Sequence, residues 1–247
     1  MERRMWLLSW TEFREALEDT DVALLPIGVN EAHGNHLPLG TDFLIPEWIA
    51  ERIAEDVNAL IAPPIRYGVV SSLSGYWGSL TLRKETFESL IYDVLVELHA
   101  NGLEKVIIIN GHGGGGHMEA IKSAMKKAWL EHGVRSAVIN WWELGSELAK
   151  EVFRTPGGHA GTDETAMIMA VDHRLVKGNV DEGEIYQYSK GVSTIPAPGS
   201  ILTYESDTRV FVPSLDKADE YANKLIDLVK MEIEKILNGW ERQEIYL

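Results

Sequence analysis

The feature that most constrains the fold is an alternation of short apolar runs with segments of helical periodicity. Val22–Ile27 and Val106–Ile109 are continuous apolar runs, and Ser136–Ile139 is a third. Uninterrupted β-branched runs are typical of strands buried on both faces of a parallel sheet. Phe43–Asp56 and Glu85–Ala100 instead repeat apolar residues at helical spacing. We therefore predict an α/β fold, with three α/β/α layers around a mainly parallel central sheet.

The rest of the chain continues this alternation without a linker or an internal repeat, which predicts a single domain over residues 1–247. The further elements expected are a short strand over Leu60–Ile65 that Pro63-Pro64 interrupts, and helices from the glycine-rich loop to about Leu130, over 162–171 and over 216–238. Gly239 is expected just beyond the end of the last helix. Residues 176–214 are rich in Gly, Pro, Ser and Thr, and we expect a hairpin or a lid there.

The composition excludes several classes of partner and site. The net charge of −15 argues against a nucleic-acid or anionic-membrane partner. The chain has no cysteine, so any metal must be held by His, Asp and Glu. No apolar run approaches the roughly 18 residues of a membrane span, and Met1–Trp10 is too short for a signal peptide. We therefore expect a cytoplasmic protein with a small-molecule substrate.

Potential metal ligands are concentrated directly after the first predicted strand, at the sheet edge where parallel sheets bind ligands. Glu31 and His33 are two residues apart, a spacing at which side chains of an extended segment point the same way. Asp42 follows near the start of the next helix, and its two oxygens suit it to bridge two metals. We expect these three to be ligands. His36 falls out of the alternation and is expected to be structural; the alternative for both histidines is hydrogen bonding within a loop.

A second group of candidates lies in the glycine-rich segment Asn110–His117. His112 is expected to be a metal ligand at the end of a central strand, and His117 to be a surface residue of the following helix. The segment also satisfies the G-x-G-x-x-G pattern of a dinucleotide-binding loop. However, the next strand ends in Asn140-Trp141, with no acid to hold a ribose. A dinucleotide-dependent oxidoreductase that uses loop 111–116 is therefore the weaker alternative.

A third group lies in the segment Gly157–Thr165, which opens a predicted helix. Glu164 is a candidate metal carboxylate, and His159 is a candidate proton-transfer residue beside it. The alternative is that Asp163 and Glu164 only stabilise the first helical turn, where acids are favoured. That explanation suffices for Asp163.

Together the three segments resemble the creatininase family, which comprises creatinine amidohydrolase and its relatives. The family pattern E-x-H-G-x-H-L-P-L-x-x-D corresponds to residues 31–42, N-G-H-G-G to 110–114, and H-A-G-x-x-E-T to 159–165. The resemblance implies a three-layer α/β/α fold and two divalent metal ions, commonly zinc, manganese or iron. It implies one ion held by Glu31, Asp42 and His112, and a second held by His33, the bridging Asp42 and another carboxylate.

The chain departs from the creatininase pattern in three places. One is Gly115, where the family has an Asn after the two glycines. Creatininase carries a metal-binding Glu two residues after the His of the second motif, where this chain has Gly114. Glu164 is therefore the candidate for the vacant ligand, and creatinine is not the expected substrate. Tyr76–Thr81 replaces a Pro-Gly-Thr stretch of the family, so a different pocket is expected. Trp77 and Trp141 are candidate substrate-binding residues, with core packing as the alternative.

The function implied is a metal-dependent amidohydrolase that cleaves a non-peptide C–N bond in an amide, a formamide or a cyclic amidine. Activities in the family include the opening of creatinine, the deformylation of a formamidopyrimidine nucleotide, and peptide trimming. The resemblance also implies a closed homo-oligomer such as a hexamer. A non-catalytic family relative is a third hypothesis, and the retention of every ligand of the first motif argues against it.

Overall fold

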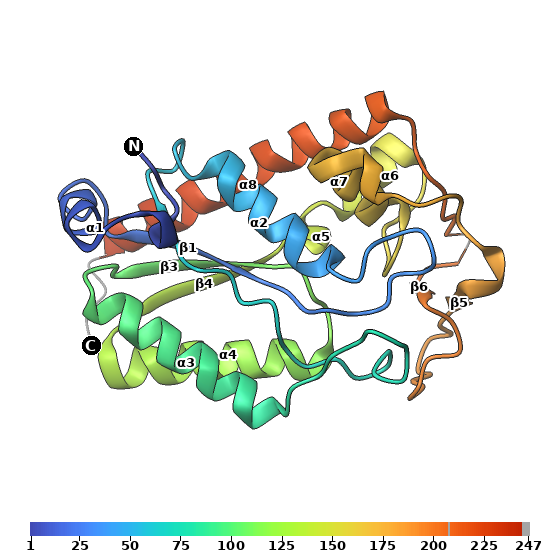
Figure 1. Ribbon diagram of the computed structural model, residues 1–247, viewed down its shortest axis with the longest axis horizontal. Coiled ribbons are helices and arrows are strands. Elements are labelled where there is room, and N and C mark those ends of the chain that lie inside the picture. The colour runs from blue at the N-terminus through green and yellow to red at the C-terminus, as the bar shows by residue number, and fades with distance from the viewer. Residues whose placement is uncertain (207, 244–247) are drawn as a thin grey trace.

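The central sheet consists of four parallel strands in the order β2-β1-β3-β4 (Figure 1). The computed structural model describes residues 1–206 and 208–243. The strands are β1 (Val22–Ile27), β2 (Leu60–Ile61), β3 (Lys105–Asn110) and β4 (Arg135–Asn140). Strands β1 and β3 pair over their whole length, from Val22 opposite Lys105 to Ile27 opposite Asn110. The predicted parallel sheet is therefore confirmed.

Helices cover both faces of the sheet and complete the three layers (Figure 1). One face carries α2 (Thr41–Ile53), α5 (Trp141–Leu144), α6 (Ser146–Phe153), α7 (Thr162–Asp172) and α8 (Leu215–Gln243). The other carries α3 (Lys84–Ala100) and α4 (Gly115–His132), with α1 (Trp10–Ala16) joining the same core. Short 3-10 turns form at η1 (Met5–Leu7), η2 (His173–Leu175) and η3 (Glu182–Glu184). Even with the 29-residue α8, no helix among the described residues is long and apolar enough to cross a membrane.

Alternate residues of the central strands join two separate cores. Leu24 and Ile107 belong to the core beneath α2 and α8, whereas Leu25 and Ile108 belong to the core beneath α3 and α4. All four side chains are fully buried. Complete burial of such a side chain contributes about 1.5–3 kcal/mol. This demand on both faces explains why these strands are apolar at every position rather than at every second one.

The strand order reverses between β1 and β3. The chain runs from β1 outward to β2, and then crosses back to add β3 and β4 on the other side. The helices that follow the two central strands lie on opposite faces, α2 in one layer and α4 in the other. A crevice therefore opens beyond the C-terminal ends of β1 and β3, the usual place for a ligand in such sheets. Both ligand-rich loops predicted from the sequence begin there.

Two glycines allow the start of α2 to pack directly on this edge of the sheet. Gly28 follows β1 and Gly111 follows β3, and a Cβ on either residue would overlap the carbonyl oxygen of Asp42. Helix α2 begins at Thr41, so Asp42 lies within its first turn. Because Gly28 and Gly111 have no side chain, the backbone of Asp42 fits into the gap between β1 and β3. The Gly111 position is explained by this contact, without a dinucleotide.

Two expected boundaries are wrong for identifiable reasons. The strand predicted over Leu60–Ile65 is limited to two residues, because Pro63 and Pro64 have no N–H to donate to a neighbouring strand. Helix α8 continues through Gly239 to Gln243. A glycine within a helix costs only about 1 kcal/mol relative to alanine, which the packing of a long amphipathic helix outweighs.

The irregular segment 176–214 does not form the expected hairpin. Its two short strands, β5 (Ile185–Gln187) and β6 (Ile201–Thr203), are paired in parallel, and a hairpin requires antiparallel pairing. The pair lies beyond the C-terminal end of the central sheet (Figure 1). Backbone bonds tie it to the start of α7, with the His159 N–H donating to the Leu202 carbonyl at 3.0 Å.

Replacing Gly111 with Ala should destabilise the fold by about 3 kcal/mol, because the added Cβ meets backbone rather than a movable side chain. Gly115→Ala is the matched control in the same loop, since a Cβ there has no atom within 4 Å. Denaturant unfolding of both variants measures the difference. Equal stability of the two variants would show that α2 does not depend on this contact.

Candidate metal centre

Six ionisable side chains converge in the crevice from four segments of the chain. They are Glu31 and His33 from the loop after β1, Asp42 from α2, His112 from the loop after β3, and His159 and Glu164 from the start of α7. Apart from His159, which is half-buried, none of them is more than 6% exposed. Buried charges are tolerated only when they are paired or coordinate a metal. The sequence-predicted ligands therefore meet at one place.

The carboxylate of Asp42 stands between two histidines. Its Oδ1 lies 2.8 Å from Nε2 of His33, and its Oδ2 lies 2.9 Å from Nδ1 of His112. One carboxylate thus presents a different oxygen to each imidazole. This is the arrangement expected of a ligand shared by two neighbouring cations.

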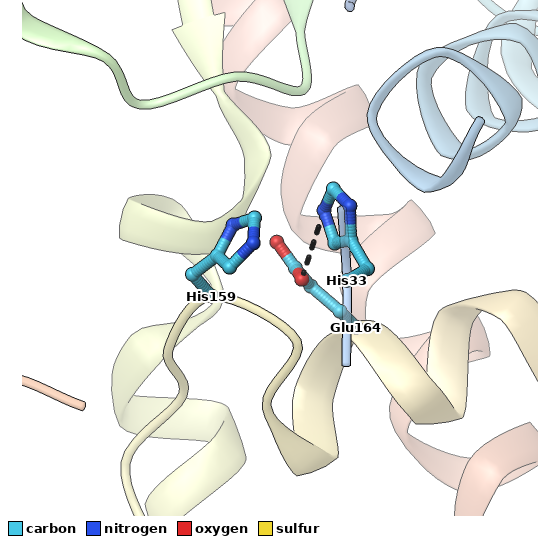
Figure 2. A group of neighbouring side chains, drawn as sticks. All are labelled: His33, His159 and Glu164. Carbon is cyan, nitrogen blue, oxygen red and sulfur yellow. Dashed lines mark ion pairs between the residues drawn. The ribbon is translucent and has the colours of Figure 1, made fainter. Parts of the chain in front are cut away.

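Two groups of potential ligands adjoin at Asp42, which belongs to the first of them. One consists of Glu31, Asp42 and His112, and the other of His33, His159 and Glu164. Within each group the ligand atoms lie within 4.8 Å of one another. Figure 2 shows the second group, in which Oε2 of Glu164 lies 3.5 Å from Nε2 of His33. The chain therefore offers two adjoining positions for metal ions, with nitrogen and oxygen donors that suit zinc, manganese or iron.

Backbone carbonyls fix the orientation of all three histidine rings. Nδ1 of His33 lies 3.0 Å from the Glu31 carbonyl, Nε2 of His112 lies 3.1 Å from the Val69 carbonyl, and Nε2 of His159 lies 2.7 Å from the Ala32 carbonyl. A carbonyl oxygen only accepts, so each of these nitrogens donates its proton. The other nitrogen of each ring is turned toward the carboxylates, as in histidines that ligate metals.

The charges of the cluster depend on one another. Burial opposes charge on His33, but the carboxylates of Asp42 and Glu164 outweigh it and raise its pKa to about 10. Burial also opposes charge on His112, yet Glu31 and Asp42 raise its pKa well above the usual value. Although burial alone would raise the pKa of Asp42, the two histidines hold it well below its usual range. These carboxylates thus require adjacent positive charge, which protons or metal ions are able to supply.

The hydrogen bonding of Glu31 also fits a bound metal ion. Oε2 of Glu31 is buried and accepts no hydrogen bond, although Nδ1 of His112 lies 3.1 Å away. The proton on Nδ1 of His112 is directed instead to Oδ2 of Asp42, at 2.9 Å. A buried carboxylate oxygen without a donor is costly in a protein interior. A cation between Glu31, Asp42 and His112 would satisfy it.

His159 differs from the other two histidines of the cluster. Burial and then the neighbouring His33 lower its pKa to about 4, so the ring is neutral at neutral pH. Its free nitrogen, Nδ1, lies 3.9 Å from Oε2 of Glu31. The rings of His33 and His159 are 4.1 Å apart (Figure 2). His159 is thus placed to accept a proton at Nδ1 beside both groups of ligands.

Glu164 lies where the sequence comparison left a ligand missing. Burial raises the pKa of its carboxyl well above the usual value, although His33 opposes this. Its Oε2 also accepts the Ala160 N–H at 2.7 Å, which holds the side chain toward His33. Gly114 has no room for an acid, because a Cβ there would lie 2.5 Å from Nε2 of His112. Glu164 is the carboxylate in the group that also contains His33 and His159.

Two further histidines, His36 and His117, are buried next to residues that carry candidate ligands. His36 is fully buried, and its Nε2 lies 3.1 Å from the Thr165 hydroxyl, in agreement with the structural role expected of it. His117 was expected on the surface, and this expectation is wrong. Its ring is fully buried and stacks on Phe87 with a centroid distance of 4.4 Å. Helical periodicity did not reveal this, because Gly68 and Phe87, which cover the ring, are distant from it in the sequence.

The metal-binding groups open into a cavity of about 940 Å³. Trp142 lines this cavity, whereas Trp141 is fully buried in the core and does not reach it. The core-packing alternative therefore holds for Trp141. Trp77 is 97% exposed and is not part of the cavity wall, so its role in substrate binding stays a prediction.

The sequence did not identify several residues of the cavity wall. Tyr188, Lys190 and Tyr204 line the cavity and come from the irregular segment 176–214, which was expected to form a lid. The rings of Tyr188 and Tyr204 are stacked at a centroid distance of 5.7 Å. Burial raises the pKa of Tyr204 to about 12, so its phenol stays protonated. No motif marks these residues, because their meeting depends on the parallel pairing of β5 with β6.

The creatininase family model, described as creatinine amidohydrolase, matches residues 6–208 of this chain. A creatinine amidohydrolase of Pseudomonas putida is 27% identical over 187 residues, covering 68% of this chain and 72% of that protein. A mycofactocin precursor peptide peptidase of Mycolicibacterium smegmatis is 29% identical over 156 residues, covering 61% and 58%. A 3-dehydro-scyllo-inosose hydrolase of Thermotoga maritima is 27% identical over 172 residues, covering 66% and 54%. The chain spans little more than half the length of the last two.

Solved creatininase structures share the whole fold. A manganese form matches with a TM-score of 0.81 at 21% identity, covering 95% of this chain and 98% of that chain. A mutant of the zinc–zinc type matches with a TM-score of 0.80 at 22% identity, covering 95% and 98%. The glycine-rich loop thus lies in a creatininase fold. Since the family model spans most of the sequence, and the buried His, Asp and Glu residues form two metal-site groups, the chain belongs to the creatininase family of metal-dependent amidohydrolases.

Proposed function

We propose that this protein is a two-metal hydrolase that cleaves a non-peptide C–N bond in an amide, a formamide or a cyclic amidine other than creatinine. The observation that carries the proposal is the position of Asp42, whose two oxygens face two separate groups of His and carboxylate ligands. A single-metal protein has no need for a buried carboxylate shared in this way. The solved zinc–zinc and manganese creatininases support the same class of centre.

We assign Glu31, Asp42 and His112 to one metal ion, and His33, Asp42 and Glu164 to the other. Zinc, iron or manganese suits these donors. When bound, two such ions activate a water molecule and polarise the carbonyl or amidine carbon that it attacks. The burial of all five ligands excludes bulk water and strengthens these electrostatic effects.

His159 is proposed to move the proton of the reaction. Its Nε2 is committed to the Ala32 carbonyl, so Nδ1 is the atom that receives a proton and then delivers it to the leaving nitrogen. A neutral histidine beside the carboxylate of Glu31 is suited to this task. A carboxylate oxygen of Glu164 lies within 4.8 Å of a ring nitrogen of His159, close enough to take part in the same transfer (Figure 2).

The cavity supports a substrate larger than creatinine. Its volume of about 940 Å³ lies at the upper end of the range for sites that hold drug-sized ligands. Trp142 and Tyr204 offer flat surfaces on its wall, and Lys190 offers a positive charge. A formamidopyrimidine nucleotide combines a formamide with a flat ring and fits this description. A closed homo-oligomer and a cytoplasmic location remain expectations that belong to this proposal.

A screen with the metal-loaded protein tests the substrate class. We expect hydrolysis of a formamidopyrimidine nucleotide or a related formamide, and little or none of creatinine or of short peptides. Release of formate or of an amine, measured with and without a chelator, is the readout. Chelator-sensitive turnover of peptides alone would contradict the proposal. A thermal shift with NAD or NADP would favour the oxidoreductase, and metal binding without any turnover would favour the non-catalytic relative.

Replacing Asp42 with Asn should lower the bound metal from two equivalents to one or none, and activity by at least about 10³-fold, because the amide cannot bridge two cations as a carboxylate does. Elemental analysis of the purified variant measures the metal content. Glu143→Gln is the matched control, since Glu143 is an acid of the same cavity wall outside both ligand groups. A variant at Asp42 with two metals and full activity would exclude a bridging role.

The metal-free protein should lose stability as the pH rises from about 7 to 10. The pKa of His33 is about 10 in the folded protein against an ordinary value of 6.5, so its imidazolium stabilises the fold fully below pH 6.5. This contribution disappears as the pH rises through 10. Metal binding already keeps His33 neutral, so the loaded protein should lack this component.

Melting temperatures of chelator-treated and zinc-loaded protein, compared from pH 6 to 10, measure the effect. His33→Gln should reduce the extra pH dependence of the metal-free form and leave the part that His112 contributes. Parallel curves for the treated and loaded wild-type protein would show that His33 carries no such proton.

A further inference from the structure

His117 lies directly behind the metal ligand His112 and is not explained by the proposed function. It belongs to the first turn of α4, is fully buried, and is not part of the cavity wall. Its ring meets that of His112 edge-on, with 4.9 Å between centroids and an interplanar angle of 90°. Phe87 stacks on one side of the ring. Gly68 lies against it as well, where a Cβ would overlap the imidazole.

Hydrogen bonds connect His117 and His112 in a closed circuit. The Val69 N–H donates to Nδ1 of His117 at 3.3 Å, so Nδ1 is an acceptor and the ring carries its proton on Nε2. Nε2 of His117 then donates to Oδ1 of Asn110 at 3.2 Å, and the His112 N–H donates to the same oxygen at 3.2 Å. Nε2 of His112 closes the circuit by donating to the Val69 carbonyl at 3.1 Å.

The two histidines therefore hold the two sides of one residue, Val69. Its N–H is bound to His117 and its carbonyl to His112. Val69 lies outside the helices and strands, so no regular ladder of hydrogen bonds fixes the direction of its carbonyl. The bond to His117 supplies that restraint. Asn110 secures the other end, because its Nδ2 also donates to the His112 carbonyl at 2.9 Å.

The orientation of His112 follows from this circuit. With Nε2 committed to Val69, only Nδ1 is free to face Asp42 at 2.9 Å and Glu31 at 3.1 Å. We propose that His117 is a positioning residue, which fixes the ring of His112 through Val69 and Asn110 and so sets the affinity of the metal position formed by Glu31, Asp42 and His112. This inference rests on the two-metal assignment but not on the identity of the substrate.

Two substitutions of His117 separate hydrogen bonding from packing. His117→Phe keeps a ring against Phe87 and removes both hydrogen bonds, whereas His117→Gln retains an N–H for Asn110 and an oxygen for Val69. Phe87→Leu is the control that disturbs packing alone. We expect His117→Phe to weaken one of two zinc equivalents by 10- to 100-fold, as found for partners that orient metal ligands. His117→Gln should recover most of this loss, and Phe87→Leu should lower stability without changing zinc affinity.

Zinc titration of the chelator-treated proteins against a competing chelator measures both equivalents. In a double-mutant cycle, His117→Phe should add no further loss to His112→Ala, and should add its full effect to Glu164→Gln. The ¹⁵N spectrum of the zinc-loaded protein provides a second readout, in which Nε2 of His112 should carry the ring proton in the wild type and share it with Nδ1 in His117→Phe.

Three results would overturn the inference: equal weakening of both equivalents, additivity with His112→Ala, or an unprotonated Nε2 of His112 in the wild type. Failure of the proposed function gives a different pattern. Wild-type protein that binds two zinc ions and hydrolyses no C–N substrate would contradict the proposed function and leave the positioning result standing.

Discussion

The contact on which the site depends is the seating of α2 against two strand ends that carry no side chains. Gly28 and Gly111 both lie against the carbonyl oxygen of Asp42, so the helix start reaches the gap between β1 and β3. From there one carboxylate faces the histidines that follow each strand. The sheet topology creates the gap, and the glycines decide which residue fills it. A methyl group at either glycine would push the start of α2 away from the strand ends and move the shared carboxylate of Asp42 out of reach of one histidine.

In the buried cluster, the cost of removing charges from water opposes the attraction between them. Several carboxylates and imidazoles are buried together, an arrangement whose desolvation cost usually exceeds the attraction between the charges. The histidines bind protons unusually tightly there because the carboxylates have no other source of positive charge. In the proposed two-metal centre, bound metal ions would replace those protons. The affinity for metal and the stability of the metal-free fold are thus two aspects of one charge distribution, and they change together with pH.

The sequence predicted much of this arrangement, and the misses have physical causes. Apolar runs located β1 and β3, because burial on both faces leaves a strong local signal. A shorter run also located β4, a largely half-buried edge strand. The ligands were found because Glu31 and His33 share a side of an extended loop. The wall residues Tyr188 and Tyr204 were missed, since they meet only through the pairing of β5 with β6. His117 was misplaced because its burial depends on Gly68 and Phe87, which are distant in sequence.

The crowding around Gly114 restricts how the ligands of such a site change in evolution. The His112 ring and the Val69 carbonyl occupy the volume that a side chain at position 114 would need. A lineage with this ring orientation is therefore unable to acquire the acid of creatininase by one substitution, because the new side chain would displace an existing ligand. An acid at position 114 and this orientation of the His112 ring therefore exclude one another, and introducing the acid requires a second change that moves the ring.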